Sequence, residues 1–297
     1  MRQNRVLAMV ACLALAGPGS GVGVMAQDAD LQLIPAPHMA EPLAETLFQR
    51  GFGESRAAVI GAESDIFANR MAAIYMGGTE GESWRDEVAR IHDPARVAAL
   101  LLAAVQRELD RAGALDPDLV LLLGATGVDV APDGEGMILA ARIQLARPGA
   151  LEGVALRMRA DEVKDAPVLA AIDAMIDAED PESTEMARSM NRQLAFATGF
   201  AEAEGFDFPA SPDDAAADLT LQMPELLDEA TMRIRLSWYA AYAPLGAAAV
   251  DRSAVLRARP GAEALRALLD RAESDVLAQL GRETGRAAAR RMKGTRL

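Results

Sequence analysis

The sequence contains few of the side chains that carry most catalytic chemistry. Its 297 residues include 1 cysteine, 2 histidines and only 4% aromatic residues. Neither His38 nor His92 belongs to an HExxH or similar ligand pattern, and no G-x-S-x-G element is present to supply a serine nucleophile. So few aromatics also disfavour a stacking surface for bases or sugars. We therefore predict a non-enzymatic protein with no metal site and no cofactor.

Positive charge is scarce as well. Lys and Arg number 30 against 44 Asp and Glu, which gives a formal net charge of −14. This balance argues against nucleic-acid binding, because contacts to phosphates need clustered cations. A hydrophobic fraction of 51% is nevertheless enough for a buried core, so the chain is not expected to be disordered as a whole.

The N-terminus has the layout of a secretory signal peptide. Arg2 and Arg5 precede an apolar run over residues 6–16, and a Gly-rich stretch follows that closes with Ala26. Small residues at that point suit cleavage after Ala26. The apolar run is shorter than the ~20 residues that span a bilayer, and no later run is long and apolar enough. We predict that residues 1–26 are a signal peptide, that the protein is periplasmic or secreted, and that the mature chain has no transmembrane segment.

The single cysteine, Cys12, lies inside this signal. A lipoprotein-type cut just before Cys12 would leave only half of the apolar run ahead of it, so we favour the cut after Ala26. The mature chain then has no disulfide, no thiolate nucleophile and no sulfur ligand. Loss of Arg2 and Arg5 leaves 28 basic against 44 acidic residues, so the mature net charge is −16.

The rest of the chain is predicted to be all-α. Four dipeptides place a capping side chain directly before proline: Asp93-Pro94, Asp116-Pro117, Asp180-Pro181 and Ser211-Pro212. Asp or Ser accepts the free N–H groups of a helix start, and proline at the first helical position loses no hydrogen bond. Each dipeptide therefore marks the start of a helix. Alternating strand patterns are scarce.

Helical periodicity and these start signals predict a multi-helix bundle. The predicted helices cover residues 54–75, 84–91, 94–111, 117–123, 137–147, 150–163, 167–178, 181–203, 225–243, 248–258 and 262–291. We divide the chain into the signal peptide (1–26), an N-terminal linker with a first helix (27–53) and a helical domain (54–297).

One segment imitates a dinucleotide-binding loop. Residues 120–127 read as an apolar strand followed by a glycine-rich turn. Counted from Gly124, the second and third glycine places fall on Thr126 and Asp129, and no helix begins there. A helix that ends at a glycine cap is the better interpretation.

Acidic pairs leave a hydrolase as an alternative function. The pairs are Asp173 and Asp177, Asp180 and Glu182, and Asp213 and Asp214. A glycosidase needs two carboxylates that flank a sugar, and nothing distinguishes one of these pairs from the others. Solvated helix faces explain them, and a hydrogen bond at the helix junction explains His92. A periplasmic hydrolase that uses a carboxylate or His92 stays the alternative.

The aromatic residues gather in two clusters. Phe196, Phe200, Phe206 and Phe208 surround a helix end and its loop, whereas Trp238, Tyr239 and Tyr242 share one helix. Trp238 and Tyr242 are four residues apart and so lie on one face. Core packing explains both clusters. A groove between them is the alternative, and it would make the protein a carrier of apolar ligands.

The C-terminus departs from the acidic trend. Basic residues follow one another there at helical spacing: Arg282, Arg286, Arg290, Arg291, Lys293 and Arg296. Cations near a helix C-terminus interact favourably with its dipole, which is a structural explanation. The functional alternative is a stripe that binds an anionic envelope surface or an acidic envelope protein. We therefore predict that the protein binds an envelope partner through a groove or through this stripe. The candidate partner-binding residues are Arg282, Arg286, Arg290, Arg291, Trp238 and Tyr242.

Two short motifs carry a family resemblance. At residues 90–96, Arg-Ile-His-Asp-Pro-Ala-Arg before an apolar helix, and at residues 241–245, Ala-Tyr-Ala-Pro-Leu, the chain resembles the domain-of-unknown-function 2059 family. The resemblance extends loosely over residues 54–281 and implies an exported bacterial helical protein of the alphaproteobacterial type. It implies no known reaction and no site residue. It also suggests two diverged helical repeats, near 94–147 and 225–290.

Overall fold

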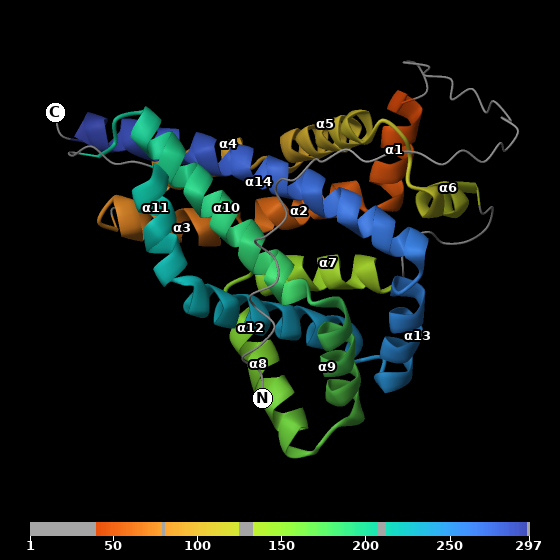
Figure 1. Cartoon of the computed structure of the whole chain (residues 1–297). Coiled ribbons are helices and arrows are strands. Elements are labelled where there is room, and N and C mark those ends of the chain that lie inside the picture. The colour runs from red at the N-terminus through yellow and green to blue at the C-terminus, as the bar shows by residue number, and fades with distance from the viewer. Residues whose placement is uncertain (1–39, 79–80, 125–132, 207–211, 296–297) are drawn as a thin grey trace, which may run out of the picture. The chain divides into compact units, whose positions relative to one another are not determined.

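The part of the chain that the structure describes consists of helices joined by short turns (Figure 1). This computed structural model describes residues 40–78, 81–124, 133–206 and 212–295, and no strand occurs among them. Fourteen helices follow one another in these ranges: α1 Ala40–Arg50, α2 Gly53–Ala62, α3 Ser64–Tyr75, α4 Glu82–Ile91, α5 Pro94–Ala112, α6 Pro117–Gly124, α7 Asp133–Leu145, α8 Ala150–Val163, α9 Pro167–Glu179, α10 Pro181–Glu202, α11 Pro212–Leu221, α12 Met223–Tyr242, α13 Ala247–Arg257 and α14 Pro260–Thr295. The predicted all-α multi-helix bundle is confirmed.

The helix starts follow the predicted signals, with one difference in mechanism. Oδ1 of Asp93 accepts the Arg96 N–H at 3.0 Å, and Oδ1 of Asp116 accepts the Asp118 N–H at 2.8 Å. Asp180 was expected to cap α10 in the same way, but its backbone is left-handed, with φ of 49°, and its side chain makes no cap hydrogen bond. Proline at the first position starts α10 without that cap. Ser211 lies outside the described residues.

Two predicted boundaries are wrong. The single helix expected over residues 54–75 is divided at Glu63 into α2 and α3. The hydroxyl of Ser64 donates to the Gly61 carbonyl at 2.7 Å, a local bond that competes with the helical ladder. Helix α7 begins at Asp133 rather than at 137. The other predicted helices agree with the structure to within a few residues.

Several sequence predictions concern residues outside the described ranges. They are the signal peptide (1–26) with Cys12, most of the linker with His38, the loop after Gly124, and Phe208. The two proposed repeats span α5 to α7 and α12 to α14, and they stay a prediction.

The described helices enclose two separate apolar cores. The first core collects side chains from α1 to α6, α10 and α14, and the largest include Leu47, Met71, Trp84, Phe196 and Leu280. The second collects side chains from α7, α8, α9, α12 and α13, and the largest include Met158, Ile172, Leu236, Trp238 and Tyr242. Burial of these side chains is the main stabilising contribution, because each large one contributes about 1.5–3 kcal/mol.

Helices α10 and α14 run side by side in the same direction (Figure 1). Their backbones approach closely because glycines face the contact. A Cβ at Gly199 would lie 2.0 Å from the Arg282 carbonyl oxygen, and a Cβ at Gly285 would lie 2.1 Å from that of Phe196. Only glycine leaves room for a backbone oxygen at this distance.

A layer of buried ion pairs connects helices of the two cores. Oε1 of Glu135, on α7, accepts a hydrogen bond from Arg56 of α2 at 2.6 Å. Its Oε2 accepts one from Arg257 of α13 at 2.8 Å. Arg56 also binds Glu273 of α14 at 2.8 Å, and Arg257 binds Glu179 of α9 at 2.7 Å. Buried charges of this kind are tolerated only when they are paired, and these pairs link α2 and α14 of the first core to α7, α9 and α13 of the second.

None of the described helices has both the length and the apolar character that a membrane crossing requires.

Candidate functional site

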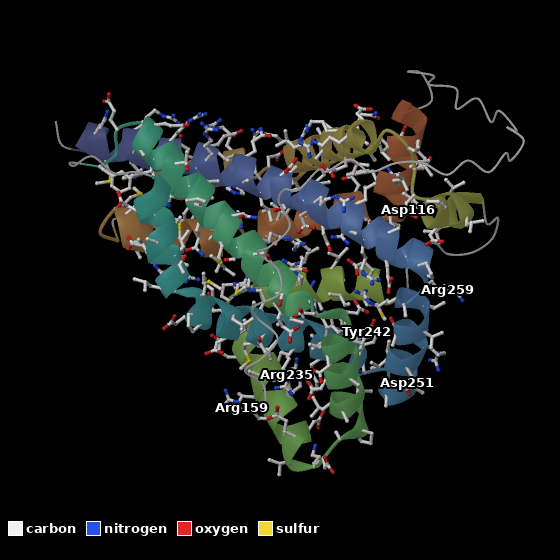
Figure 2. All side chains as sticks on the ribbon, in the orientation of Figure 1. Asp116, Arg159, Arg235, Tyr242, Asp251 and Arg259 are labelled. Carbon is white, nitrogen blue, oxygen red and sulfur yellow. The ribbon has the colours of Figure 1, made fainter. Side chains whose placement is uncertain are left out.

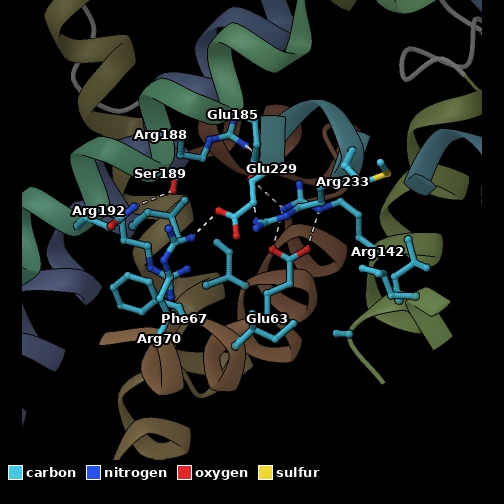
Figure 3. Close-up of a pocket in the computed structure, with 18 of the residues that line it drawn as sticks. Glu63, Phe67, Arg70, Arg142, Glu185, Arg188, Ser189, Arg192, Glu229 and Arg233 are labelled. Atoms are coloured by element: carbon cyan, nitrogen blue, oxygen red, sulfur yellow. Dashed lines mark hydrogen bonds and ion pairs between the residues drawn. The ribbon is translucent and has the colours of Figure 1, made fainter. Parts of the chain in front are cut away.

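A cavity of about 590 Å³ lies where this polar layer meets α3, α8, α10 and α12 (Figure 3). Its volume falls within the ~300–1,000 Å³ typical of small-molecule sites. The wall is partly apolar. Ile60, Leu236 and Leu277 are buried, whereas Ile66 and Met232 are about half exposed, at 53% and 50%. Exposed apolar side chains on the wall of a cavity provide an entry surface for a ligand with an apolar body.

Most of the polar part of the cavity wall is charged. The charged lining residues are Glu63, Arg70, Arg142, Glu185, Arg188, Arg192, Glu229, Arg233 and Glu273. Their count of five arginines and four glutamates gives the wall a net positive charge, the opposite of the chain as a whole. An anion is therefore favoured in the cavity over a cation.

Most of these charges are satisfied within the chain (Figure 3). Nε of Arg142 donates to Glu63 at 2.9 Å and Nη2 donates at 2.8 Å, a bidentate pair. Arg70 is paired with Glu229. Three further pairs surround the cavity: Arg188 with Glu185 at 3.1 Å, Arg233 with Glu185 at 3.4 Å, and Arg188 with Glu273 at 3.3 Å.

Arg192 differs from the other cavity arginines. Among the described residues, no carboxylate lies within 4.0 Å of its guanidinium, which stacks on Phe67 with Cζ 3.7 Å from the ring centroid. Its Nη2 donates to Nε2 of His92 at 3.0 Å, and its Nε is buried without a partner. Burial lowers the pKa of Arg192 to about 10, and Arg233 and Arg142 also lower it while Glu63 and Glu185 raise it. The group is thus still a cation at neutral pH.

His92 supports Arg192 as a neutral imidazole. Its Nδ1 lies 3.1 Å from the Val88 carbonyl oxygen, which can only accept, so Nδ1 carries the proton and Nε2 accepts from Arg192. Burial lowers the pKa of His92 to about 3, and the cations Arg192 and Arg96 lower it further against the bond to Val88. The predicted hydrogen bond at the helix junction is confirmed.

The predicted aromatic residues do not line this cavity. Trp238 and Tyr242 are 2% and 0% exposed within the second core, where the Tyr242 hydroxyl lies 2.6 Å from Oγ of Ser253 (Figure 2). Phe196 and Phe200 pack in the first core. The two clusters therefore belong to different cores, and the ring that reaches the cavity is Phe67, in edge-to-face contact with Phe196 at 6.1 Å.

The predicted basic stripe lies along the end of α14, where its side chains bind acidic neighbours. Arg282 and Arg286 both donate to Glu202, Arg290 lies 3.5 Å from Glu87, and Lys293 donates to Glu204 at 2.6 Å. Arg291 donates to Oγ of Ser83 at 2.6 Å. None of these stripe residues lines the cavity, although α14 also contributes Glu273 and Leu277 to the cavity wall. Arg296 lies outside the described residues.

The acidic pairs include a carboxylate that is engaged by an arginine. Asp173 binds Arg235 at 2.9 Å. No group of three or more potential metal ligands occurs within residues 40–78, 81–124, 133–206 and 212–295. His92 has both ring nitrogens engaged, one by Val88 and one by Arg192.

Sequence reasoning missed the charged cavity residues, although their spacing carries a signal. Glu185, Arg188 and Arg192 lie three and four residues apart on α10, and Glu229 and Arg233 lie four apart on α12. Such spacings place side chains on one helix face. On an isolated sequence they are typical of solvated helix faces, so only the packing of the helices shows that these faces meet.

No protein-family model, curated protein or solved structure matches the chain, so the site is interpreted from its own geometry.

Proposed function

We propose that this protein binds a small organic molecule with an apolar body in the cavity between α3, α8, α10 and α12. The observation that carries the proposal is the cavity itself: about 590 Å³, with buried Ile60 and Leu236 in its wall and exposed Ile66 and Met232 beside them. Apolar walls with a few oriented polar groups are the common form of a ligand site. This is the carrier function that the aromatic clusters suggested, at a different place in the fold.

The chemistry of the wall supports binding rather than catalysis. All four of its carboxylates are paired with arginines, and for Glu185 and Glu273 these arginines lower the pKa of the carboxyl group against the effect of burial. Glu273 illustrates this, because burial raises its pKa but Arg188 and Arg56 lower it to about 2. A general acid or base needs a pKa near the working pH.

Binding of the neutral apolar dye Nile red tests the proposal. We expect its fluorescence to rise with wild-type protein and to fall several-fold in Ala146→Trp, which fills the cavity from its wall. The matched control is Ala99→Trp, at an exposed position on α5, and it should bind as the wild type does. Equal binding by both variants would contradict the proposal.

Export and family membership are proposals of the same kind. The Arg2 and Arg5 start, the apolar run over residues 6–16 and Ala26 support a signal peptide, and the motif at residues 90–96 supports membership of the domain-of-unknown-function 2059 family. The intact mass of the protein recovered from its native cell envelope tests the cut after Ala26. A mass that includes Cys12 would overturn it.

The basic stripe supports a second role, contact with an anionic envelope partner. Arg282 and Arg286 share the single carboxylate of Glu202, so positive charge is left over. Removing the C-terminal part of α14 would be a poor test of this role, because Ala288 and its neighbours are buried in the first core. Arg286→Gln combined with Arg290→Gln keeps the helix, and it should weaken binding to vesicles that contain anionic lipid. Unchanged binding would exclude the role.

A further inference from the structure

We propose that the cavity selects a monocarboxylate with an apolar tail and that Arg192 binds its carboxylate. The inference rests on the proposed binding function and names the ligand class and the residue that recognises it. Three observations support it. The guanidinium of Arg192 has no carboxylate partner among the described residues, His92 and Phe67 hold it in place, and the charges of the cavity wall sum to one positive charge.

The guanidinium of Arg192 has one nitrogen, Nη1, that is neither hydrogen-bonded nor fully buried. Nη2 is engaged by His92, and Nε is buried without a partner. Nη1 has no hydrogen-bond partner among the described residues and, unlike Nε, is not fully buried. A largely buried cation without a carboxylate in contact is costly, so an incoming anion supplies an interaction that the chain itself does not.

Arg192 is also held rigidly in position. The guanidinium stacks on Phe67 at 3.7 Å from Cζ to the ring centroid, and the neutral His92 accepts from Nη2. His92 is in turn fixed by its bond to the Val88 carbonyl. A cation with two fixed contacts loses little side-chain freedom when a ligand arrives, which favours binding.

The charge balance indicates the ligand's charge. Each of the other charged wall residues has an opposite partner, for example Arg142 with Glu63 and Arg70 with Glu229. One uncompensated positive charge accommodates a single negative charge, whereas a phosphate dianion would leave net negative charge beside Glu63 and Glu185. The apolar residues Ile66, Leu236 and Met232 fit an aliphatic or aromatic tail.

Displacement of Nile red by octanoate and by 1-octanol separates this inference from the proposed function. We expect octanoate to displace the dye at a concentration roughly tenfold or more below that of the alcohol, because only the carboxylate forms an ion pair with the guanidinium, whereas the alcohol oxygen can accept only a weaker hydrogen bond. In Arg192→Gln that advantage should vanish while dye and alcohol still bind. Arg107→Gln, an exposed arginine on α5, is the matched charge control and should keep it.

The results of these displacement experiments distinguish the ligand-class inference from the proposed binding function. If dye binds and octanoate and octanol displace it equally in the wild type, or if Arg192→Gln keeps the preference, the inference is overturned and the binding function stands. If no dye binds, both fall. A second measurement needs no variant: the carboxyl of bound ¹³C-labelled octanoate should titrate below the free acid, since the guanidinium stabilises the carboxylate. A bound carboxyl that titrates at or above the free acid would contradict the inference.

Discussion

His92 accepts a hydrogen bond from Arg192, with 3.0 Å between Nε2 and Nη2, and donates one to the Val88 carbonyl at 3.1 Å. This pair of bonds needs a neutral ring. Protonation would place a proton on Nε2 against the Arg192 cation, which is why burial and this cation hold the pKa of His92 at about 3. The folded protein therefore resists protonation of His92 where the unfolded chain does not.

The stability of the protein should fall as the pH is lowered from about 7 to about 5. In the unfolded chain the pKa of His92 is near its ordinary 6.5, so in this window the unfolded state binds a proton that the folded state excludes. The unfolded state is thereby stabilised, and the free energy of unfolding falls. We expect a loss of roughly 1–2 kcal/mol, measured by urea unfolding at the two pH values. His92→Gln, which does not titrate, should show a clearly smaller difference, and an equal difference would count against the neutral assignment.

Removal of the Glu135 charge should be strongly destabilising. Burial alone would raise its pKa, but Arg56 and Arg257 hold the pKa of the Glu135 carboxyl below its usual value. Glu135→Gln removes one of the carboxylates that each buried guanidinium group binds, so we expect the free energy of unfolding to drop by about 3–5 kcal/mol. The control is Glu204→Gln, which breaks the exposed pair with Lys293 and should cost far less, because solvent screens that pair. Similar losses in both variants would argue against a buried ionic layer.

Gly199→Ala should disrupt the contact between α10 and α14. The new Cβ would lie 2.0 Å from the Arg282 carbonyl oxygen, a backbone atom that cannot rotate away, so the helices must separate. We expect a loss of about 1–3 kcal/mol or more in thermal or urea unfolding. Gly153→Ala in α8 meets only Nη1 of Arg157 at 3.8 Å and should stabilise the helix by up to ~1 kcal/mol. Equal behaviour of the two variants would contradict the close packing.

Tyr242 and Ser253 should show energetic coupling. Their hydroxyl oxygens lie 2.6 Å apart inside the second core, so each provides the other's partner. Tyr242→Phe and Ser253→Ala should each cost about 1–3 kcal/mol, because each leaves a buried hydroxyl unsatisfied or a packing gap. The double variant should cost less than the two losses together, since no orphan remains. Strict additivity in a double-mutant cycle would show that the hydroxyls do not interact.

Most of the fold was predictable from local signals, because capping and proline geometry act over a few residues. Asp93 caps α5 and Asp116 caps the start of α6, as their positions before proline indicate. The errors arise where the backbone or a side-chain hydrogen bond departs locally from helix geometry. Asp180 adopts a left-handed backbone, and a bond between Ser64 and Gly61 accompanies the division of a helix that is continuous in its periodicity.

The site was less predictable than the fold. The residues singled out for their rarity, Trp238 and Tyr242, turn out to be core side chains, whereas the arginines of the cavity resembled ordinary surface charges. An arginine on a helix face looks the same in sequence whether water or a carboxylate from another helix lies opposite it.

The helical class, the helix starts, the acidic balance and the scarcity of nucleophiles and metal ligands can be read from the chain, because composition and local hydrogen bonding decide these properties. The packing of distant helices joins Glu135 to Arg56 and Arg257, and it leaves Arg192 with no carboxylate within 4.0 Å among the described residues. These relationships join residues far apart along the chain, and burial gives them their strength, since a charge is costly only once water has been removed from it.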